Sequence, residues 1–248
     1  MRIDLNADLG ELPGEEGRAL DAAILSQVTS CSIACGGHAG DEDTMHAALG
    51  AAKAAGVLPG AHPSYPDREG FGRRSMDIQP EILLPLLKEQ LAALRAAGDA
   101  VGIALSHIKP HGALYNDAAK GGALAEAVLR LCEEERLPLY GLADSPLARM
   151  AEGRVRFIGE GFADRRYRED GTLTPRSEAG AVIEDEAAQA AQAVTLATRA
   201  PLRTDGDPLT LDVKTLCLHG DTRGAAMSAR RLRAALKAAG VDVRPPHG

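Results

Sequence analysis

Short apolar runs alternate along the chain with longer stretches in which Ala and Leu recur at helical spacing. Each apolar run ends in a polar turn that contains Gly or Pro, which indicates a strand followed by a loop. The predicted strands span residues 2–8, 31–35, 57–61, 101–105, 138–142, 155–158 and 213–218. The predicted helices span about 18–28, 41–55, 80–97, 118–135, a short segment from 145, 185–197 and 225–239.

Strands that alternate with helices are typical of a parallel sheet with helices outside it. A doubly wound sheet binds its ligand at one or two switch points, whereas polar clusters follow most of the strands in this chain. A closed barrel instead brings the carboxyl ends of all its strands to one face. We therefore expect an α/β fold in which residues 1–248 form one domain, a distorted seven-stranded (β/α) TIM-like barrel.

The composition does not alter this fold prediction, but it argues against several classes of function. The 248 residues carry a net charge of −7, and Lys and Arg are dispersed, which disfavours nucleic-acid binding. No signal-peptide core or run of about 18 apolar residues is present, so we expect a cytoplasmic protein outside the membrane. The cysteines lack zinc-ribbon spacing and are predicted to be buried structural thiols; they are Cys31, Cys35, Cys132 and Cys217.

The densest polar cluster lies in residues 106–116, SHIKPHGALYN, after the fourth predicted strand. Lys109, His111 and Tyr115 are costly at a strand end unless something binds there, and the Pro and Gly between them shape the backbone. Similar groups follow the other strands. The strand-end candidates are Asp4, Asn6, Asp8, His38, Asp41, His62, Ser64, Tyr65, Lys109, His111, Tyr115, Glu160, Asp164, Arg165, His219 and Asp221.

Four of the seven histidines directly follow a strand, which favours one shared site over four separate structural roles. Together with Asp8 they could hold a divalent metal that activates water, although no compact H-E-x-x-H motif is present. They could instead act as acids and bases, with Lys109 holding an anion. The candidate metal ligands are Asp8, His38, His62, His111 and His219.

Carboxylates and arginines complete the candidate chemistry. Asp8 and Glu160 are possible general bases, and their alternative role is ion pairing to a nearby Lys or Arg. The adjacent pairs 73–74 and 165–166 are arginines in long loops, where their forks suit a carboxylate or phosphate, or pair with surface acids. No G-x-x-x-x-G-K-[ST] motif occurs, so the chain has no recognisable nucleotide site of its own.

Several longer motifs occur in order over nearly the whole chain: 4–11 (DLNADLGE), 33–41 (IACGGHAGD), 60–67 (GAHPSYPD), 70–74 (GFGRR), 109–116 (KPHGALYN), 160–167 (EGFADRRY), 171–176 (GTLTPR) and 219–221 (HGD). Together they resemble the LamB/YcsF family. Two positions depart from the family pattern, since Ala7 stands where Cys is frequent and Gly37 where Phe is frequent. The Ala at position 7 argues against a thiol nucleophile there.

The resemblance implies a barrel similar to those of polysaccharide deacetylases and related glycosidases. It also implies the role of the A subunit in a 5-oxoprolinase, which opens 5-oxo-L-proline to L-glutamate with ATP hydrolysis, in a complex with partner subunits B and C. ATP would be used through the partners, and this chain would hydrolyse the lactam after phosphorylation of its amide oxygen. The implied catalytic residues are Asp8, His38, His62, Lys109, His111, Glu160 and His219. The implied substrate-binding residues are Asn6, Tyr65, Arg73, Tyr115, Asp164, Arg165 and Asp221.

Two other functions fit the same residues. A stand-alone metal-dependent amidase or deacetylase would act without ATP or partners, and a chelator would abolish its activity. A non-catalytic lactam- or sugar-binding subunit would bind ligand without turnover even in a complete complex. The identity of a metal and the formation of a homo-oligomer stay open at this point.

Overall fold

A parallel sheet forms the centre of the computed structural model, which describes residues 1–204, 206–218 and 224–246. Its strands follow the order β3–β2–β1–β6–β5–β4, and β7 also pairs with β1. Every strand pair is parallel. The strands are β1 (Arg2–Leu9), β2 (Ser30–Ala34), β3 (Leu58–His62), β4 (Leu139–Leu142), β5 (Phe157–Phe162), β6 (Thr215–Leu218) and β7 (Asp242–Val243).

Residues 106–109 close this sheet into a barrel by lying between β3 and β4. Ile108 forms parallel bridges to Ala61 of β3 and to Leu139 of β4. The Lys109 amide donates to Ala61 O, and the Tyr140 amide donates to Ile108 O, each at 2.9 Å. The ring of neighbours is therefore complete, and the expected seven-stranded (β/α) barrel is confirmed.

The fourth strand position lies later in the chain than predicted. We expected a strand over 101–105, but the preceding helix continues to Val101 and ends at Gly102, whose φ is 70°. The strand pairing is instead centred on Ile108. An apolar run of five residues cannot distinguish a helix end from a strand, and the sheet neighbours decide between them.

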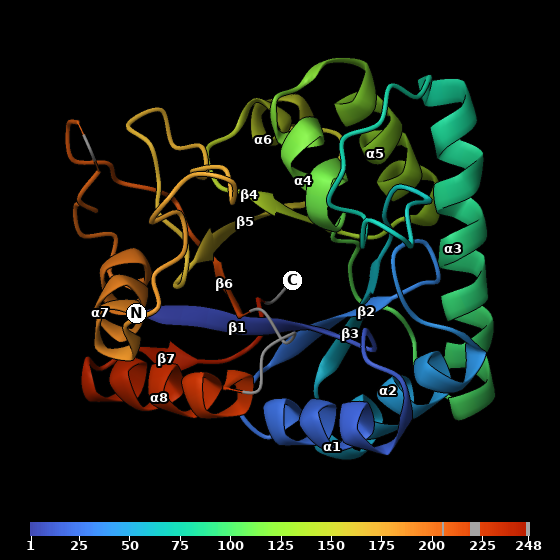
Figure 1. The fold of residues 1–248 in the computed structure, drawn as a ribbon, viewed down its shortest axis with the longest axis horizontal. Helices are drawn as coiled ribbons and strands as arrows, with labels where there is room; N and C mark the ends of the chain where they lie inside the picture. Colours follow the sequence, from blue (N-terminus) through green and yellow to red (C-terminus); the bar gives the residue numbers. More distant parts are fainter. Residues whose placement is uncertain (205, 219–223, 247–248) are drawn as a thin grey trace.

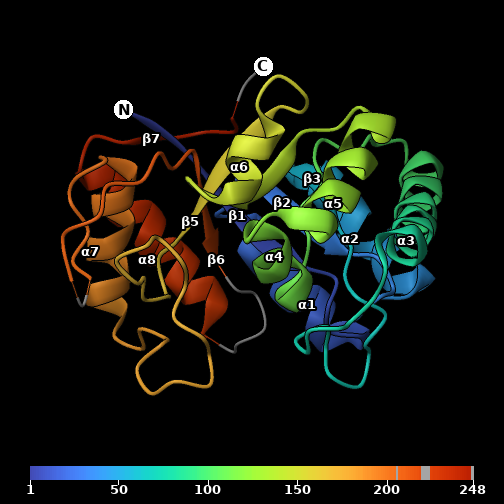
Figure 2. The ribbon, with the colours of Figure 1, turned by 90° about the horizontal axis from the view of Figure 1, so that it is seen from above.

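Helices surround the strands on the outside (Figure 1). α7 and α8 lie side by side at one end of the molecule, and α2 and α3 at the other (Figure 2). The helices are α1 (Gly14–Leu25), α2 (Glu42–Ala55), α3 (Pro80–Val101), α4 (Gly112–Ala119), α5 (Gly122–Glu135), α6 (Pro146–Ala151), α7 (Glu186–Ala197) and α8 (Ala225–Ala238). The single helix predicted over 118–135 was wrong, because Gly121 and Gly122 adopt positive φ and separate α4 from α5.

Local sequence signals explain where the helix α2 begins and ends. The Asp41 carboxylate accepts from the Thr44 amide at 2.8 Å, and the Thr44 hydroxyl accepts from the Asp41 amide at 2.7 Å. This reciprocal cap satisfies amides that have no partner within the helix. Gly56 ends the helix in the left-handed conformation with φ 68°. The cap directly follows the loop that contains His38, so it also holds the end of that loop.

His107 is a structural residue at the seam where the barrel closes. Its ring stacks on Tyr140 with a centroid distance of 3.8 Å, and its nitrogens lie 3.1 Å from Ser32 Oγ and 2.9 Å from Ser106 Oγ. Gly60 lies against the ring, so that a Cβ added there would be 2.3 Å from His107 Nε2. The prediction that His107 is buried and hydrogen-bonded, away from His111, is confirmed.

The cysteines have the surroundings that the sequence predicted. All four cysteines are buried and free, as predicted for structural thiols. Within the described ranges, no helix has the length and apolar character that crossing a membrane requires.

We predict that Gly60→Ala lowers the free energy of unfolding by about 1–3 kcal/mol, because the added methyl group overlaps a ring that Tyr140 holds from the other side. Urea denaturation measures this change. Gly50→Ala is the matched control, since nothing lies within 4 Å of its Cβ position in the interior of α2. That variant should gain about 0.5–1 kcal/mol, and equal losses in both variants would contradict the proposed packing.

Candidate active site

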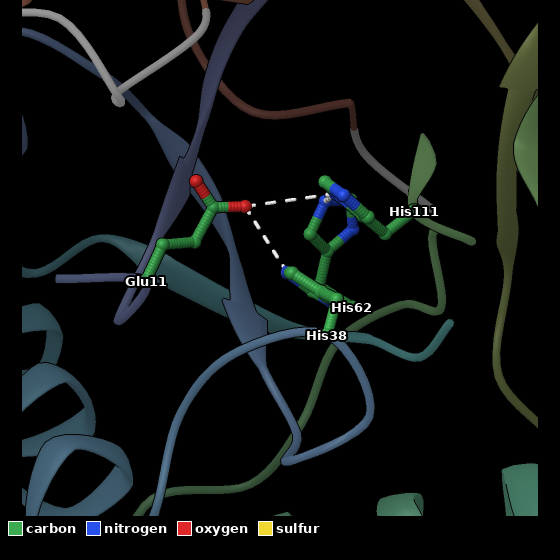
Figure 3. A group of neighbouring side chains, drawn as sticks. All are labelled: Glu11, His38, His62 and His111. Atoms are coloured by element: carbon green, nitrogen blue, oxygen red, sulfur yellow. Dashed lines mark hydrogen bonds and ion pairs between the residues drawn. The ribbon is translucent and has the colours of Figure 1, made fainter. Parts of the chain in front are cut away.

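Four side chains meet at the carboxyl ends of neighbouring strands. Glu11 follows β1, His38 follows β2, His62 ends β3, and His111 is the residue that caps α4. Each offers one ligand atom, and these atoms all lie within 4.8 Å of one another. Figure 3 shows the carboxylate of Glu11 directed at the imidazoles. We call these four residues the Glu–His cluster.

The contacts within the Glu–His cluster are short and polar. Glu11 Oε1 lies 3.1 Å from His38 Nε2 and 3.6 Å from His111 Nδ1. His62 Nε2 lies 3.0 Å from His111 Nδ1. The rings of His38 and His111 are stacked with a centroid distance of 3.6 Å. Four side chains from four separate segments therefore direct one atom each at the same small volume.

Backbone carbonyls determine which nitrogens of two rings carry protons. His62 Nδ1 lies 2.8 Å from Lys109 O, and His111 Nε2 lies 2.9 Å from Phe71 O. A carbonyl oxygen can only accept, so both of these ring nitrogens carry hydrogen. In the neutral rings, His62 Nε2 and His111 Nδ1 are then both lone pairs, and they face each other at 3.0 Å. Such a contact requires a proton or a cation between the two nitrogens.

Burial keeps two imidazoles of the cluster neutral. Burial, together with the neighbouring His62, lowers the pKa of His38 to about 2. Burial, His62 and His38 likewise hold the pKa of His111 well below its ordinary value. A neutral imidazole is the form that binds a metal, and a carbonyl on its other nitrogen is the usual outer partner of a metal ligand. The Glu–His cluster therefore has the donor set and the orientation of a divalent-metal site.

A buried ion triad lies directly behind the cluster. Lys109, whose side chain is 2% exposed, places Nζ 2.5 Å from Asp8 Oδ1 and 3.2 Å from Glu160 Oε1. Burial opposes the charged ammonium, but Asp8 and Glu160 outweigh it and raise the pKa of Lys109 well above its ordinary value. Asp8 Oδ2 in turn lies 3.3 Å from His62 Nε2. The triad thus connects the barrel interior to the cluster.

Further polar groups continue the network towards the other end of the barrel. Asn6 accepts from Lys109 Nζ at 3.0 Å and donates to Glu160 Oε1 at 2.9 Å and to Thr215 Oγ1 at 2.7 Å. The Thr215 hydroxyl donates to Asp4 at 2.5 Å. Burial raises the pKa of Asp4, while hydroxyl donors, Ser30 first, act against this rise. Asn6 therefore contacts the triad directly, and Thr215 links Asn6 to Asp4. The structure does not bring Asn6 or Asp4 into the cluster.

The two tyrosines of the predicted site have different surroundings. Tyr65 is buried, and its hydroxyl donates to Asp117 on α4 at 3.3 Å, so the structure does not bring it into the cluster. The Tyr115 ring packs edge-on against Phe162 with a centroid distance of 5.7 Å. Burial and the neighbouring Glu160 raise the pKa of the Tyr115 phenol well above its ordinary value. Tyr115 is thus placed beside the triad.

The structure separates the two arginine pairs. Arg73 and Arg74 are both exposed, and Arg74 pairs with Asp67. Arg165 is buried, whereas Arg166 is exposed. Neighbouring side chains alternate along extended backbone, so Arg165 faces inward and Arg166 faces solvent. Sequence spacing alone treats the members of each pair as equivalent.

Glu11 is the cluster residue that sequence reasoning missed. It lies in the first motif, and its signal was a carboxylate three positions after Asp8, just past Gly10. Gly10 has a φ of 71°, and its amide donates to Asp21 at 3.0 Å, which fixes the turn that carries Glu11. The predicted site residue Asp164 is half-buried, just after β5. His219 and Asp221 lie outside the described residues.

A pocket of about 260 Å³ opens beside the cluster on the side of α2. Its lining includes Glu11, His38, Asp41, Arg68 and Phe71. Solvent or a small ligand can therefore approach two of the candidate metal ligands from this side.

The fold and the Glu–His cluster together define a (β/α)-barrel protein with a candidate metal centre at the carboxyl ends of its strands. The LamB/YcsF family model matches residues 3–248, and the chain belongs to that family. It is 47% identical to the 5-oxoprolinase A subunit of Methylococcus capsulatus, covering 97% of this chain and 94% of the relative.

Two solved structures have a similar fold, one at high and one at low sequence identity. The lactam utilization protein from Thermus thermophilus matches with a TM-score of 0.89 and 37% identity, over 98% of this chain and 99% of that one. The polysaccharide deacetylase Bc1974 from Bacillus cereus matches with a TM-score of 0.53 and 14% identity, over 99% of this chain and 93% of that one. The second likeness shows the fold alone and agrees with the deacetylase-like barrel expected from the sequence.

We predict that Lys109→Met lowers the free energy of unfolding by about 3–5 kcal/mol, because two buried carboxylates lose their counter-charge. Chemical denaturation at pH 7 measures this loss. Lys120→Met is the matched control, since the Lys120 side chain is 70% exposed just after α4, where it pairs with Asp117. Little change is expected there, and a similarly small change for Lys109→Met would contradict the structural role of the triad.

Proposed function

We propose that this chain is the subunit of a cytoplasmic 5-oxoprolinase that opens the lactam ring of 5-oxo-L-proline to give L-glutamate. The observation that carries this proposal is the similarity, over nearly the full length of both chains, to a relative named as the A subunit of 5-oxoprolinase. The sequence contains no phosphate-binding loop, which supports a division of labour with partner subunits B and C. In this proposal the partners use ATP to activate the lactam by phosphorylation, and the present chain hydrolyses it.

The Glu–His cluster fits a divalent ion, for which three neutral imidazoles and one carboxylate are suitable ligands. The strongest support is the pair of lone-pair nitrogens of His62 and His111 that face each other at 3.0 Å. Glu11, His38, His62 and His111 would hold the ion. When bound, it would supply a Lewis acid and lower the pKa of a coordinated water.

Asp8 is the carboxylate best placed to move the proton. Its Oδ2 lies 3.3 Å from His62 Nε2, on the cluster side of the triad, whereas Glu160 is 0% exposed and lies deeper. In the proposed step a water oxygen bonds to the lactam carbon, and Asp8 takes a proton of that water. The carbon–nitrogen bond then breaks as the two protons of that water pass to the ring nitrogen, which gives the free amine and an acyl phosphate. A second water hydrolyses the acyl phosphate to the glutamate carboxylate and inorganic phosphate.

Lys109 has a positioning role in this proposal. Its ammonium already contacts Asp8, Glu160 and Asn6, so its three hydrogens have partners inside the protein. It orients the Asp8 carboxylate. The role of an anion clamp, which the sequence suggested for Lys109, therefore passes to another cation.

We predict that the purified chain binds about one divalent ion, as measured by elemental analysis after dialysis. Glu11→Gln and His62→Ala should each weaken binding by more than roughly tenfold, which is the lower end of the loss expected at a metal site. His46→Ala, on α2 and outside the cluster, is the control and should retain the ion. A metal-free wild-type chain that takes up no added Zn²⁺, Mn²⁺ or Co²⁺ would show that a proton joins the two imidazoles.

We predict that L-glutamate is released from 5-oxo-L-proline only when the chain, both partner subunits and ATP are present. Asp8→Asn in the same complex should lower kcat by roughly 100-fold or more, since it removes a general base. The assay measures glutamate with each component omitted in turn.

The same assay separates the other functions. A stand-alone amidase, which the metal-type cluster also suits, would act without ATP or partners and lose activity with a chelator. Binding of 5-oxo-L-proline without turnover in the complete complex would identify a non-catalytic subunit. Either result would overturn the proposed function.

A further inference from the structure

A lactam substrate with a carboxylate needs a cation at the mouth of the barrel, and Arg165 has the required surroundings. It follows β5, five residues after Glu160, and its side chain is 5% exposed. Its Nη2 donates to Thr174 O at 2.6 Å. Among the described residues, its Nε has no hydrogen-bond partner. A buried donor of a charged group that lacks a partner is costly, so this position favours an added acceptor.

Among the residues that the structure describes, two arginines and one aspartate act on the charge of Arg165. Burial lowers its pKa, and the nearby positive charges of Arg176 and Arg73 lower it further, whereas Asp164 acts in the opposite direction. Two further arginines near a buried guanidinium repel it, and an anion bound among them would relieve that repulsion.

This positive region lies beside the Glu–His cluster. The guanidinium carbon of Arg73 lies over the Phe71 ring, 5.0 Å from its centroid, and the Phe71 carbonyl accepts from His111 Nε2 at 2.9 Å. The positive charge of Arg73 lowers the pKa of both His38 and Arg165. Arg73 therefore lies close to the cluster, and its charge also acts on Arg165.

The pocket beside α2 is a poorer site for an anion. Two carboxylates, Glu11 and Asp41, line it together with one guanidinium, that of Arg68. Arg68 already donates to Gly36 O at 2.8 Å and to Gly40 O at 2.9 Å. A negative ligand would meet net repulsion there, which leaves Arg165 as the favoured position.

We infer that Arg165 binds the carboxylate of the lactam substrate and thereby selects for carboxylate-bearing lactams. This inference rests on the proposed function. The planar guanidinium presents Nε–H beside a second N–H in the fork that matches a carboxylate. The substrate carboxylate would lie on Arg165 while its lactam carbonyl lies at the Glu–His cluster.

The test compares 5-oxo-L-proline with 2-pyrrolidinone, the same lactam without its carboxylate. In the complete complex, Arg165→Gln should lower kcat/KM for 5-oxo-L-proline by roughly 10- to 100-fold, mainly through KM, because a charge-assisted pair is lost. The value for 2-pyrrolidinone should stay within about twofold of wild type. Arg165→Lys should recover only part of the loss, because it keeps the charge without the fork. Arg166→Gln, an exposed neighbour, is the matched control.

Calorimetry on the full chain without ATP measures binding directly and separates the carboxylate from any phosphate. Arg165→Gln should weaken 5-oxo-L-proline binding and leave 2-pyrrolidinone unchanged. Equal losses for both lactams, or unchanged values for both, would overturn the inference, as would loss of discrimination in Arg68→Gln instead. If the wild-type complex binds 5-oxo-L-proline without cleaving it, the proposed function fails, while the binding comparison still decides the role of Arg165.

Discussion

The ammonium of Lys109, held between Asp8 and Glu160, is the interaction on which the rest of the site depends. Three buried charges are tolerable in a barrel interior only when each one has partners, and here they join β1, β5 and the segment that closes the barrel. The same interaction directs Asp8 at His62. The fold and the chemistry therefore share one set of contacts, and loss of the cation would damage both.

Backbone carbonyls around the Glu–His cluster orient two of its imidazoles. The carbonyls of Lys109 and Phe71 each accept a hydrogen bond from one imidazole N–H, so the other nitrogen of each neutral ring carries a lone pair directed at the centre. One of these carbonyls belongs to the residue that carries the triad. The orientation of His62 thus depends on the barrel seam, while that of His111 depends on the loop that also carries Arg73.

Much of the site could be predicted because parallel strands place their carboxyl ends together. His38, His62 and His111 were found from their positions after strands, and the structure brings all three into contact. Glu11 was not found, because a turn at Gly10 redirects the chain after the strand has ended. The fourth strand was misplaced, since its partner residues at Ala61 and Leu139 are distant in sequence.

The sequence by itself determined the alternation of strands and helices, the barrel class, the family and the identity of most polar groups at the site. Those features follow from local patterns and from motifs that neighbouring residues carry together. Only the tertiary structure decided that Lys109 pairs with Asp8 and Glu160, that Arg165 faces inward while Arg166 does not, and that Glu11 joins the histidines. The physical reason is that side-chain direction and charge partners depend on which distant segments pack together, and no local pattern contains that information.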